Sequence, residues 1–546
     1  MFICSKINEL RKIQSLFLIV LVLSFSQCAK KGRPSGGPKD EEAPLFITAD
    51  PPYESINFDK DEINLYFNEY IKLKDLNKQL IISPPLNPSN PSLISPQGSP
   101  SKYINIKILD TLLANSTYIF DFGNSVKDNN ESNTLERFKY VFSTGNYIDS
   151  LTLKGTVKNS FKSENIENIK LLLYRLDSAY ADSAVYKRKP DYVTSTLDSS
   201  NYQFSNLRKG TYYLIALKDV GGDYVFNPKN DEIGFFRDSI SLPKDSILEN
   251  ILSIFKEELP YVFKRGKEIR KGQLIFGYEG KTSNLKVETL SAVPDDFYTI
   301  SFPEKGKDTL NLWHSPIELD SLIFKVTNNN VSDTVTVKLR KKQLDSLVVS
   351  EITGGVLNYK DTLFFGTNNP IVKLDTTKIN FVDADTISIP FSPFISKNEN
   401  KVGFIFEKKF KMSYKFNLYP NALIDIFNTS NDTLKSQFRT RSTDDYGEIS
   451  LTIQNPDTTP VIIQLTDIND KTVAQEKTSI SKTITFNYLL PKKYKIRIIY
   501  DYNNNGKWDT GNYLKKQLPE PVKYFSKTQE VRPNWILNEI IKIGLE

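Results

Sequence analysis

The stretch INLYFNEYIKLKDLNK, residues 63–78, decides the fold class of this chain of 546 residues. It opens with apolar residues at every second position, Ile63, Leu65 and Phe67, and the residues between them are Asn and Tyr. Successive side chains of a β-strand point to opposite faces, so this spacing buries one face and leaves the other in water. The stretch therefore predicts an antiparallel strand that buries one of its two faces.

The same alternation recurs along the rest of the chain. Further runs occupy residues 104–108, 138–142, 335–339, 449–453 and 494–498. Clusters of Asn, Asp, Gly and Pro separate these short runs, and no long stretch has apolar residues at helical spacing. A chain of this length also exceeds what one hydrophobic core can hold. We therefore expect an all-β protein, built as a tandem string of antiparallel β-sandwich domains.

A segment within the opening stretch has a second copy later in the chain. The segment NEYIKLKDLNK begins at Asn68, and NNPIVKLDTTK begins at Asn368, a shift of 300 residues. Four residues keep their identity at this shift: Asn68, Ile71, Asp75 and Lys78 correspond to Asn368, Ile371, Asp375 and Lys378. The alternative is chance similarity between short strands, but four identities at one shift favour a duplicated module.

A second repeat has a different shift, of 282 residues. Phe204, Leu207, Tyr212 and Asp219 correspond to Phe486, Leu489, Tyr494 and Asp501. Two unequal shifts indicate two module types, A and B, each of which is used twice. We expect this order: signal peptide 1–27, lipidated Cys and flexible tether 28–43, module A1 44–146, module B1 150–250, a divergent β-domain 256–345, module A2 346–441 and module B2 446–546.

The N-terminal segment predicts export and lipidation. Three basic residues precede an apolar run, Leu16–Phe25, in which Ser24 is the one polar residue. The run is as long as the core of a signal peptide and too short to span a membrane comfortably. Cys28 follows, in a context that resembles the lipobox of bacterial lipoproteins, although Phe25 and Gln27 replace its usual residues. An ordinary signal peptide with an incidental cysteine is the alternative. We expect Cys28 to carry lipid that anchors the chain in a membrane.

Charge and cysteine content argue against a nucleic-acid-binding protein and against a fold held by internal disulfides. The chain has 71 basic and 65 acidic residues, a mixed surface that argues against nucleic acid as a partner. Its two cysteines are Cys4 and Cys28, and Cys4 lies inside the predicted signal peptide. The mature chain would keep one cysteine, so no internal disulfide is expected.

The segment CAKKGRPSGGPKD that begins at Cys28, together with FNEYIKLKDLNKQLIISPP in module A1, closely resembles the Ig-like-domain lipoproteins of Bacteroidota. Module A resembles the bacterial Ig-like domain of S-layer-type proteins. Module B, with F-x-x-L-x-x-G-x-Y at Phe204–Tyr212, resembles transthyretin-like or Cna-B-type sandwiches. Lys492 replaces Gly210 in the second copy, which places the turn there in question. The resemblance implies a surface or periplasmic stalk and supplies no catalytic residues.

The segment from Asp501 to Asn512 follows the residue spacing of a calcium-binding loop, in which oxygen ligands alternate along a tight turn. The candidate ligands are Asp501, Asn503, Asn505, Lys507 through its carbonyl, Asp509 and Asn512. Asn512 replaces the glutamate that normally closes such a site, and no helices flank the loop. The alternative is a hairpin turn in which Asn and Asp side chains bond the backbone. Calcium is a hypothesis for the cofactor of this loop, beside the hairpin-turn alternative.

Aromatic residues are abundant, with 28 tyrosines and 34 phenylalanines. Most lie at alternating strand positions, where aromatic side chains fill sandwich cores. Three aromatic residues of the last loop of module B2 are instead expected to be exposed, and are candidates for stacking on a glycan: Tyr502, Trp508 and Tyr513.

Catalytic motifs are absent from the sequence. His314 is the only histidine, and the alternative to a functional role is a histidine at a strand edge beside Trp313. There is no Walker A loop, nucleophile elbow or zinc-protease motif.

We therefore expect a non-catalytic lipoprotein of the cell envelope, anchored in the outer membrane through its N-terminal lipid and facing the periplasm or the cell surface. It would act as a structural or interaction stalk. An adhesin that binds an envelope protein or glycan is the second hypothesis, and an envelope hydrolase is a remote third.

Overall fold

The computed structural model describes residues 39–87, 92–164, 166–178, 180–339 and 343–544. The predicted signal peptide, Cys28 and most of the tether lie outside the described residues. The chain divides into two compact units: unit 1 takes in residues up to Leu80, Asn90–Thr111 and Phe120–Phe142, and unit 2 takes in Ile81–Ser89, Leu112–Ile119 and Ser143–Glu546. Among the residues that the structure describes, no helix is long and apolar enough to cross a membrane.

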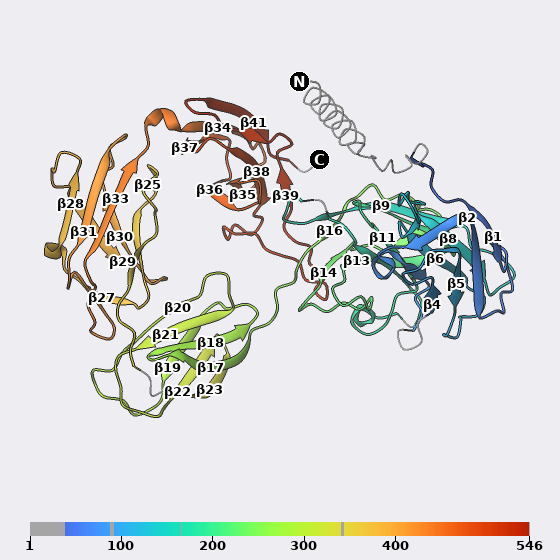
Figure 1. The fold of residues 1–546 in the computed structure, drawn as a ribbon, viewed down its shortest axis with the longest axis horizontal. Coiled ribbons are helices and arrows are strands. Elements are labelled where there is room, and N and C mark those ends of the chain that lie inside the picture. The colour runs from blue at the N-terminus through green and yellow to red at the C-terminus, as the bar shows by residue number, and fades with distance from the viewer. Residues whose placement is uncertain (1–38, 88–91, 165, 179, 340–342, 545–546) are drawn as a thin grey trace, which may run out of the picture. The chain divides into compact units, whose positions relative to one another are not determined.

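The fold is all-β, as expected from the alternation, and consists of many small, mostly antiparallel sheets arranged as tandem sandwiches (Figure 1). The strands of module A1 are β1 (Phe46–Asp50), β2 (Glu62–Leu73), β3 (Ile81–Ser83), β4 (Leu93–Ser95), β5 (Ser101–Lys107), β6 (Thr117–Gly123), β7 (Val126–Asp128) and β8 (Phe138–Ser143), with the short helix α2 (Leu76–Gln79). The order of one sheet is β1-β2-β5-β4, with β7 paired to β2, and the order of the other is β3-β6-β8. Ile63, Leu65 and Phe67 are buried, as the opening stretch predicts.

Module A2 repeats this strand order. Its strands are β24 (Val349–Glu351), β25 (Val356–Leu357), β26 (Leu363–Thr367), β27 (Ile371–Leu374), β28 (Ile379–Asp383), β29 (Phe391–Ile395), β30 (Lys401–Phe406), β31 (Ser413–Leu418), β32 (Leu423–Asp425) and β33 (Leu434–Thr440), with the 3-10 turn η2 (Thr376–Lys378). The sheets run β24-β26-β30-β29 and β25-β33-β31-β28, and β27 pairs with β32. Ile71 lies opposite Asp128, and Ile371 lies opposite Asp425, so the repeated isoleucines occupy matching sites. The predicted duplication of module A is thereby supported.

Modules B1 and B2 also share one strand order. B1 contains β9 (Leu151–Asn159), β10 (Lys170–Arg175), η1 (Asp182–Tyr186), β11 (Tyr192–Ser195), β12 (Asn201–Leu207), β13 (Gly210–Lys218), β14 (Glu232–Phe235), β15 (Ile240–Leu242) and β16 (Leu252–Ile254), so its last strand lies beyond the expected end of the module at residue 250. B2 follows the 3-10 turn η3 (Thr443–Asp445) and contains β34 (Gly447–Gln454), β35 (Val461–Thr466), β36 (Thr472–Thr478), β37 (Lys482–Leu489), β38 (Lys493–Tyr500), β39 (Val522–Tyr524), β40 (Gln529–Glu530) and β41 (Ile536–Lys542). Sheets β11-β10-β13-β14 and β12-β9-β16 correspond to β36-β35-β38-β39 and β37-β34-β41.

The concern about the turn at Lys492 is resolved by backbone conformation. Gly210 does not have a positive φ, so its replacement by Lys492 costs no strain. The left-handed residues lie just before the two turns, Asn206 in β12 and Tyr488 in β37, at φ 53° and 54°. Each turn is also held by a tyrosine hydroxyl that donates to a backbone carbonyl: Tyr212 to Arg208 at 2.7 Å and Tyr494 to Leu490 at 2.9 Å.

The divergent β-domain is a smaller pair of sheets. Its strands are β17 (Val262–Arg270), β18 (Gln273–Glu279), β19 (Leu285–Thr289), β20 (Thr299–Pro303), β21 (Thr309–His314), β22 (Ser321–Asn328) and β23 (Val331–Lys338). They are ordered β17-β18-β21-β20 and β19-β22-β23. This domain, module A2 and modules B1 and B2 each enclose an apolar cluster of their own.

Candidate functional site: the loop after β38 and the contact between modules B1 and B2

The predicted calcium loop begins where β38 ends. Asp501 is buried and holds the turn, since its Oδ1 accepts the N–H of Asn505 at 2.9 Å and its Oδ2 accepts that of Gly506 at 2.7 Å. Gly506 has a φ of +81°, a conformation that suits glycine. These are the bonds of a turn in which an Asp side chain replaces backbone acceptors.

The Asp509 carboxylate binds three other polar side chains of the loop. The side-chain amides of Asn503 and Asn505 donate to its Oδ2, and the Lys507 ammonium lies 3.7 Å from its Oδ1. Partial burial acts to raise the pKa of Asp509, but these amides and the lysine charge hold the pKa below its usual value. The carboxylate is therefore stabilised as an anion by groups of its own loop.

Asn512 does not close this loop. Its N–H donates to the carbonyl of Gln517 at 2.8 Å, and its side chain accepts the N–H of Lys515 at 3.0 Å, so it belongs to a separate turn. Within the described residues, no group of three or more His, Cys, Asp or Glu side chains is placed to hold a metal ion. The hydrogen bonds of Asp501 and Asn512 favour the turn alternative over the calcium hypothesis.

The three aromatic candidates have different environments. Tyr502 is 54% exposed. The Trp508 ring is half-buried and packs on Phe161 of module B1, with 4.7 Å between ring centroids. Tyr513 is 0% exposed, so the expectation that it lies on the surface is wrong. The reason is that the segment carrying Tyr513 lies against module B1.

Tyr513 enters an aromatic cluster of module B1. Its ring centroid lies 5.3 Å from that of Phe235, 6.0 Å from Tyr186 and 6.3 Å from Tyr213. Its backbone N–H donates to the buried carboxylate of Glu257, and burial raises the pKa of that carboxylate. Tyr513 is thus an integral part of a core formed mainly by another module.

A charged residue fixes the same segment. The Lys516 ammonium lies 2.7 Å from Asp182 of module B1. It also lies 4.5 Å from the ring centroid of Tyr213 and 4.2 Å from that of Tyr513, within the range of cation–π attraction.

Module B1 makes the reciprocal contact through Phe161. The Arg497 guanidinium of module B2 lies 4.1 Å from the Phe161 ring centroid, and the Tyr524 hydroxyl donates to the Phe161 carbonyl at 3.0 Å. Arg497 is only 2% exposed. Its guanidinium also donates to the Gln464 side chain at 2.8 Å, so its burial does not leave the charge without acceptors.

A polar contact lies beside Phe161. The carboxylate of Asp470 accepts the N–H of Ser163 at 3.1 Å and its hydroxyl at 3.2 Å, and the Lys495 ammonium lies 3.1 Å from Asp470. Burial acts to raise the pKa of Asp470, but the bonds from Lys495 and Ser163 lower it below the usual value. We define the B1–B2 contact by its two parts. One part is Phe161 and Ser163 of module B1 with Arg497 and Asp470 of module B2, and the other is Tyr513 and Lys516 of module B2 with the residues of module B1 that they contact.

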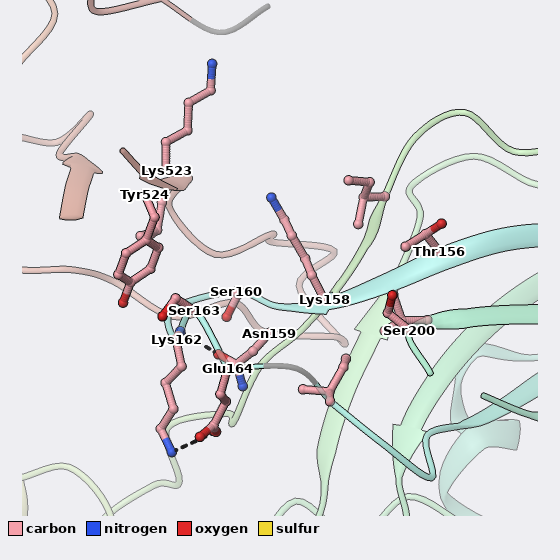
Figure 2. A pocket seen from close by; sticks show the side chains of 14 residues that line it. Thr156, Lys158, Asn159, Ser160, Lys162, Ser163, Glu164, Ser200, Lys523 and Tyr524 are labelled. Carbon is pink, nitrogen blue, oxygen red and sulfur yellow. Dashed lines mark hydrogen bonds and ion pairs between the residues drawn. The ribbon is translucent and has the colours of Figure 1, made fainter. Parts of the chain in front are cut away.

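An open cleft of about 410 Å³ lies beside this contact (Figure 2). Lys158 of β9 and Lys523 of β39 both line it, and burial together with the charge of Lys523 lowers the pKa of Lys158. The one carboxylate among its fourteen described lining residues is Glu164, which pairs with Lys162 at 3.2 Å (Figure 2). The lining therefore offers positive charge and hydroxyls, and lacks a pair of carboxylates or a histidine.

His314 lies in the interior of the divergent domain. It ends β21, which pairs with β18 on one side and β20 on the other, so the strand is central and not at an edge as expected. His314 is 2% exposed, its Nδ1 lies 2.8 Å from the Ser315 carbonyl, and burial lowers its pKa. Its ring stacks on Phe297 with 6.0 Å between centroids. This is the environment of a packed histidine.

The comparisons with known proteins concern the fold. Residues 40–144 match the family model of a bacterial Ig-like domain. No curated protein matches the chain.

Solved structures that resemble the chain include three proteins of low sequence identity. Domains 1–6 of the surface layer protein SbsC are 11% identical over 90% of this chain and 67% of that chain, with a TM-score of 0.14. The major pilin subunit BcpA of Bacillus cereus is 10% identical over 72% and 99%, with a TM-score of 0.14. The TIE protein of Bacillus anthracis is 11% identical over 93% and 76%, with a TM-score of 0.14. Scores of this size carry no argument about function. The chain thus contains a bacterial Ig-like domain at residues 40–144, within a tandem array of β-sandwiches.

Proposed function

We propose that this chain is a non-catalytic lipoprotein of the cell envelope that acts as a structural or interaction stalk. The observation that carries the proposal is the order of its parts: a predicted signal peptide and lipidated Cys28 precede an array of β-sandwiches. The first strand begins at Phe46, so a polar segment separates the lipid from the first sandwich.

The site geometry supports a non-catalytic role. The described lining of the cleft beside the B1–B2 contact has neither the paired carboxylates of a glycoside hydrolase nor a histidine. His314, through which a Ser-His-Asp triad would have to run, is buried and packed on Phe297.

The location is tested by fractionation and by protease shaving of whole cells. We expect the chain to fractionate with the outer membrane, because an acylated N-terminus partitions into lipid. Ala29, Lys30 and Lys31 follow Cys28 where some lipoproteins of Bacteroidota carry an acidic surface-export signal, which leaves a periplasm-facing location open. A chain that faces the periplasm would resist shaving of whole cells, and a chain on the cell surface would be cleaved. Recovery in the soluble fraction would contradict the proposal.

A glycan-binding adhesin is the second candidate, favoured by a tyrosine pair on module A1. Tyr66 and Tyr103 are 39% and 47% exposed on the outer face of the β2–β5 pair, with 6.0 Å between ring centroids. In the neighbouring pair, the Asn105 amide donates to Asn64 at 2.9 Å. Exposed rings beside amides suit a sugar, whose apolar face stacks and whose hydroxyls bond.

Retention of the soluble mature chain on immobilised envelope polysaccharide tests this candidate. Tyr66→Ala and Tyr103→Ala should each reduce retention, since each removes one ring. Tyr419→Ala is the matched control, because that tyrosine is 43% exposed on module A2. Equal retention of all three variants would eliminate the tyrosine pair as the site.

A further inference from the structure

The sheet β11-β10-β13-β14 of module B1 carries apolar side chains on both faces. Leu171, Leu173 and Leu214 contribute to the inner core of the sandwich. Leu172 and Ile215 are also 0% exposed, although they point to the opposite face. Strands that read as continuous apolar runs are buried on both sides, so something must cover this second face.

A segment of module B2 supplies part of that cover. The second-face cluster of B1 includes Tyr513, which lies more than 300 residues along the chain from Leu172. A buried aromatic side chain removes a large apolar area from water, about 150 to 250 Å². Without module B2, the face around Phe235 and Tyr213 would therefore lose a ring that packs directly on both.

Module B2 shows the same property in reverse. Its strands β35 and β38 bury Ile463 and Ile498 in the inner core, yet Ile462 and Ile499 on the opposite face are each only 1% exposed. The cluster on that opposite face has Phe161 of module B1 packed against it. Each module therefore contributes an aromatic side chain to an apolar face of the other.

Polar groups give this apolar contact a defined register. Lys516 pairs with Asp182, and Asp470 accepts two bonds from Ser163. The Thr510 hydroxyl donates to the Lys256 carbonyl at 2.6 Å. Hydrogen bonds and ion pairs of this kind penalise alternative docking geometries, in which they would be left unpaired.

We propose that modules B1 and B2 fold as one cooperative unit, in which each module covers an apolar face of the other. Residues 258–445 connect the two modules as a long insertion in this unit. The kind of partner that each surface fits is thus the other B module of the same chain. The proposal goes beyond the stalk function and does not depend on the lipid anchor. The expected tandem string of domains is thereby modified, because the second and the last modules contact each other directly.

Chemical cross-linking of the mature chain from residue 29 tests the contact. The wild-type chain has cysteines only at positions 4 and 28, so this form has none. Ser163→Cys combined with Asp470→Cys places two thiols at positions whose native side chains lie 3.2 Å apart. A short bis-maleimide at low protein concentration should join them within one molecule, which changes mobility on a denaturing gel. Absence of this product, or cross-linking only between molecules, would overturn the proposal.

Two tyrosines of the same loop provide a matched pair of variants. Tyr513→Ala in the double-cysteine background should slow intramolecular cross-linking about tenfold, because it removes a central buried aromatic residue from the contact. Tyr502→Ala should leave the rate unchanged, because Tyr502 is 54% exposed. Equal rates for the two variants would show that Tyr513 does not hold the modules together.

Phe161→Ala keeps the test decisive if Tyr513→Ala fails to fold. Phe161 lies in the loop after β9, and its ring packs against Arg497 and Trp508 of module B2. Its loss should also slow cross-linking, whereas Phe394→Ala, at an aromatic residue 38% exposed on module A2, should not. An unchanged rate with Phe161→Ala would overturn the claim of reciprocity.

Discussion

At the residue scale, Asp128 and Asp425 show what the duplication of module A has kept. Each lies opposite a repeated isoleucine and uses its carboxylate to hold the turn that follows. Asp128 accepts the N–H groups of residues 130 to 133, and Asp425 accepts those of Phe427 and Thr429. In a tight turn the backbone N–H groups lack carbonyl acceptors, and the carboxylate accepts their hydrogen bonds instead.

Asp128 should therefore make stability depend on pH. Burial acts to raise the pKa of Asp128, but its backbone hydrogen bonds hold the pKa below the ordinary value of 3.8. The contribution to the free energy of unfolding should be complete above that value, and lost as the pH falls through the lower pKa of the folded state. Urea unfolding at several pH values, followed on the mature chain, measures this.

Asp128→Asn tests the assignment directly. It should lower the free energy of unfolding by about 1 to 3 kcal/mol at neutral pH, because charge-assisted bonds are replaced by weaker ones. The exposed Asp59→Asn is the control and should change little. If both variants keep the acid dependence of the wild type, Asp128 is not its source.

The Asp501 loop also makes a prediction at this scale. We expect millimolar calcium to leave the melting temperature of the mature chain unchanged, because the Asp501 and Asp509 carboxylates already accept bonds within the loop and Asn512 lies in another turn. A rise of several degrees that is removed by Asp509→Ala and kept in Lys507→Ala would instead establish calcium binding. Differential scanning calorimetry distinguishes the two outcomes.

At the element scale, the strands follow from residue alternation, and their docking partners do not. Ile63, Leu65 and Phe67 predict a half-buried strand because the period of two is local information. The sequence predicts an exposed Tyr513 because it lies in the last loop of module B2, yet its environment is set by Phe235, far away in sequence. The usable signal is the run Ile496–Tyr500, whose apolar residues on both faces indicate a strand covered on both sides.

Strand packing predicts that alanine destabilises the protein at one strand glycine and is tolerated at another. A Cβ at Gly234 of β14 would lie 2.6 Å from the Ser253 carbonyl oxygen, which belongs to the backbone of β16. Gly234→Ala should therefore destabilise module B1 by about 1 to 3 kcal/mol, the usual cost of overpacking. Gly277→Ala in β18 is the control, because its nearest contact is 3.9 Å and its φ is not left-handed. Denaturant unfolding of the two variants measures the difference, and equal midpoints would refute the steric argument.

At the scale of the whole molecule, we expect lipidation of Cys28 and folding of the sandwiches to be independent of each other. Cys28→Ser should abolish lipidation, since only a thiol forms the thioether with diacylglycerol, and should leave the β-sheet circular dichroism of the chain unchanged. Detergent-phase partitioning measures the anchor. A serine variant that still partitions with detergent would contradict the lipobox assignment.

The B1–B2 contact makes the last prediction at this scale. If residues 258–445 leave one body and return to it, replacing them with a long Gly/Ser linker should leave β9–β16 and β34–β41 folded together. Lengthening a flexible loop changes its closure cost only slowly, by about 0.6 kcal/mol for each doubling, so the linker need not match the native segment in length. Amide hydrogen exchange should then protect β13 and β38 equally, because one cooperative unit opens as a whole. Tyr513→Ala should lower the protection of both strands, including β13 of the module that was not mutated. Loss of protection confined to module B2 would mean that the modules fold separately and only touch.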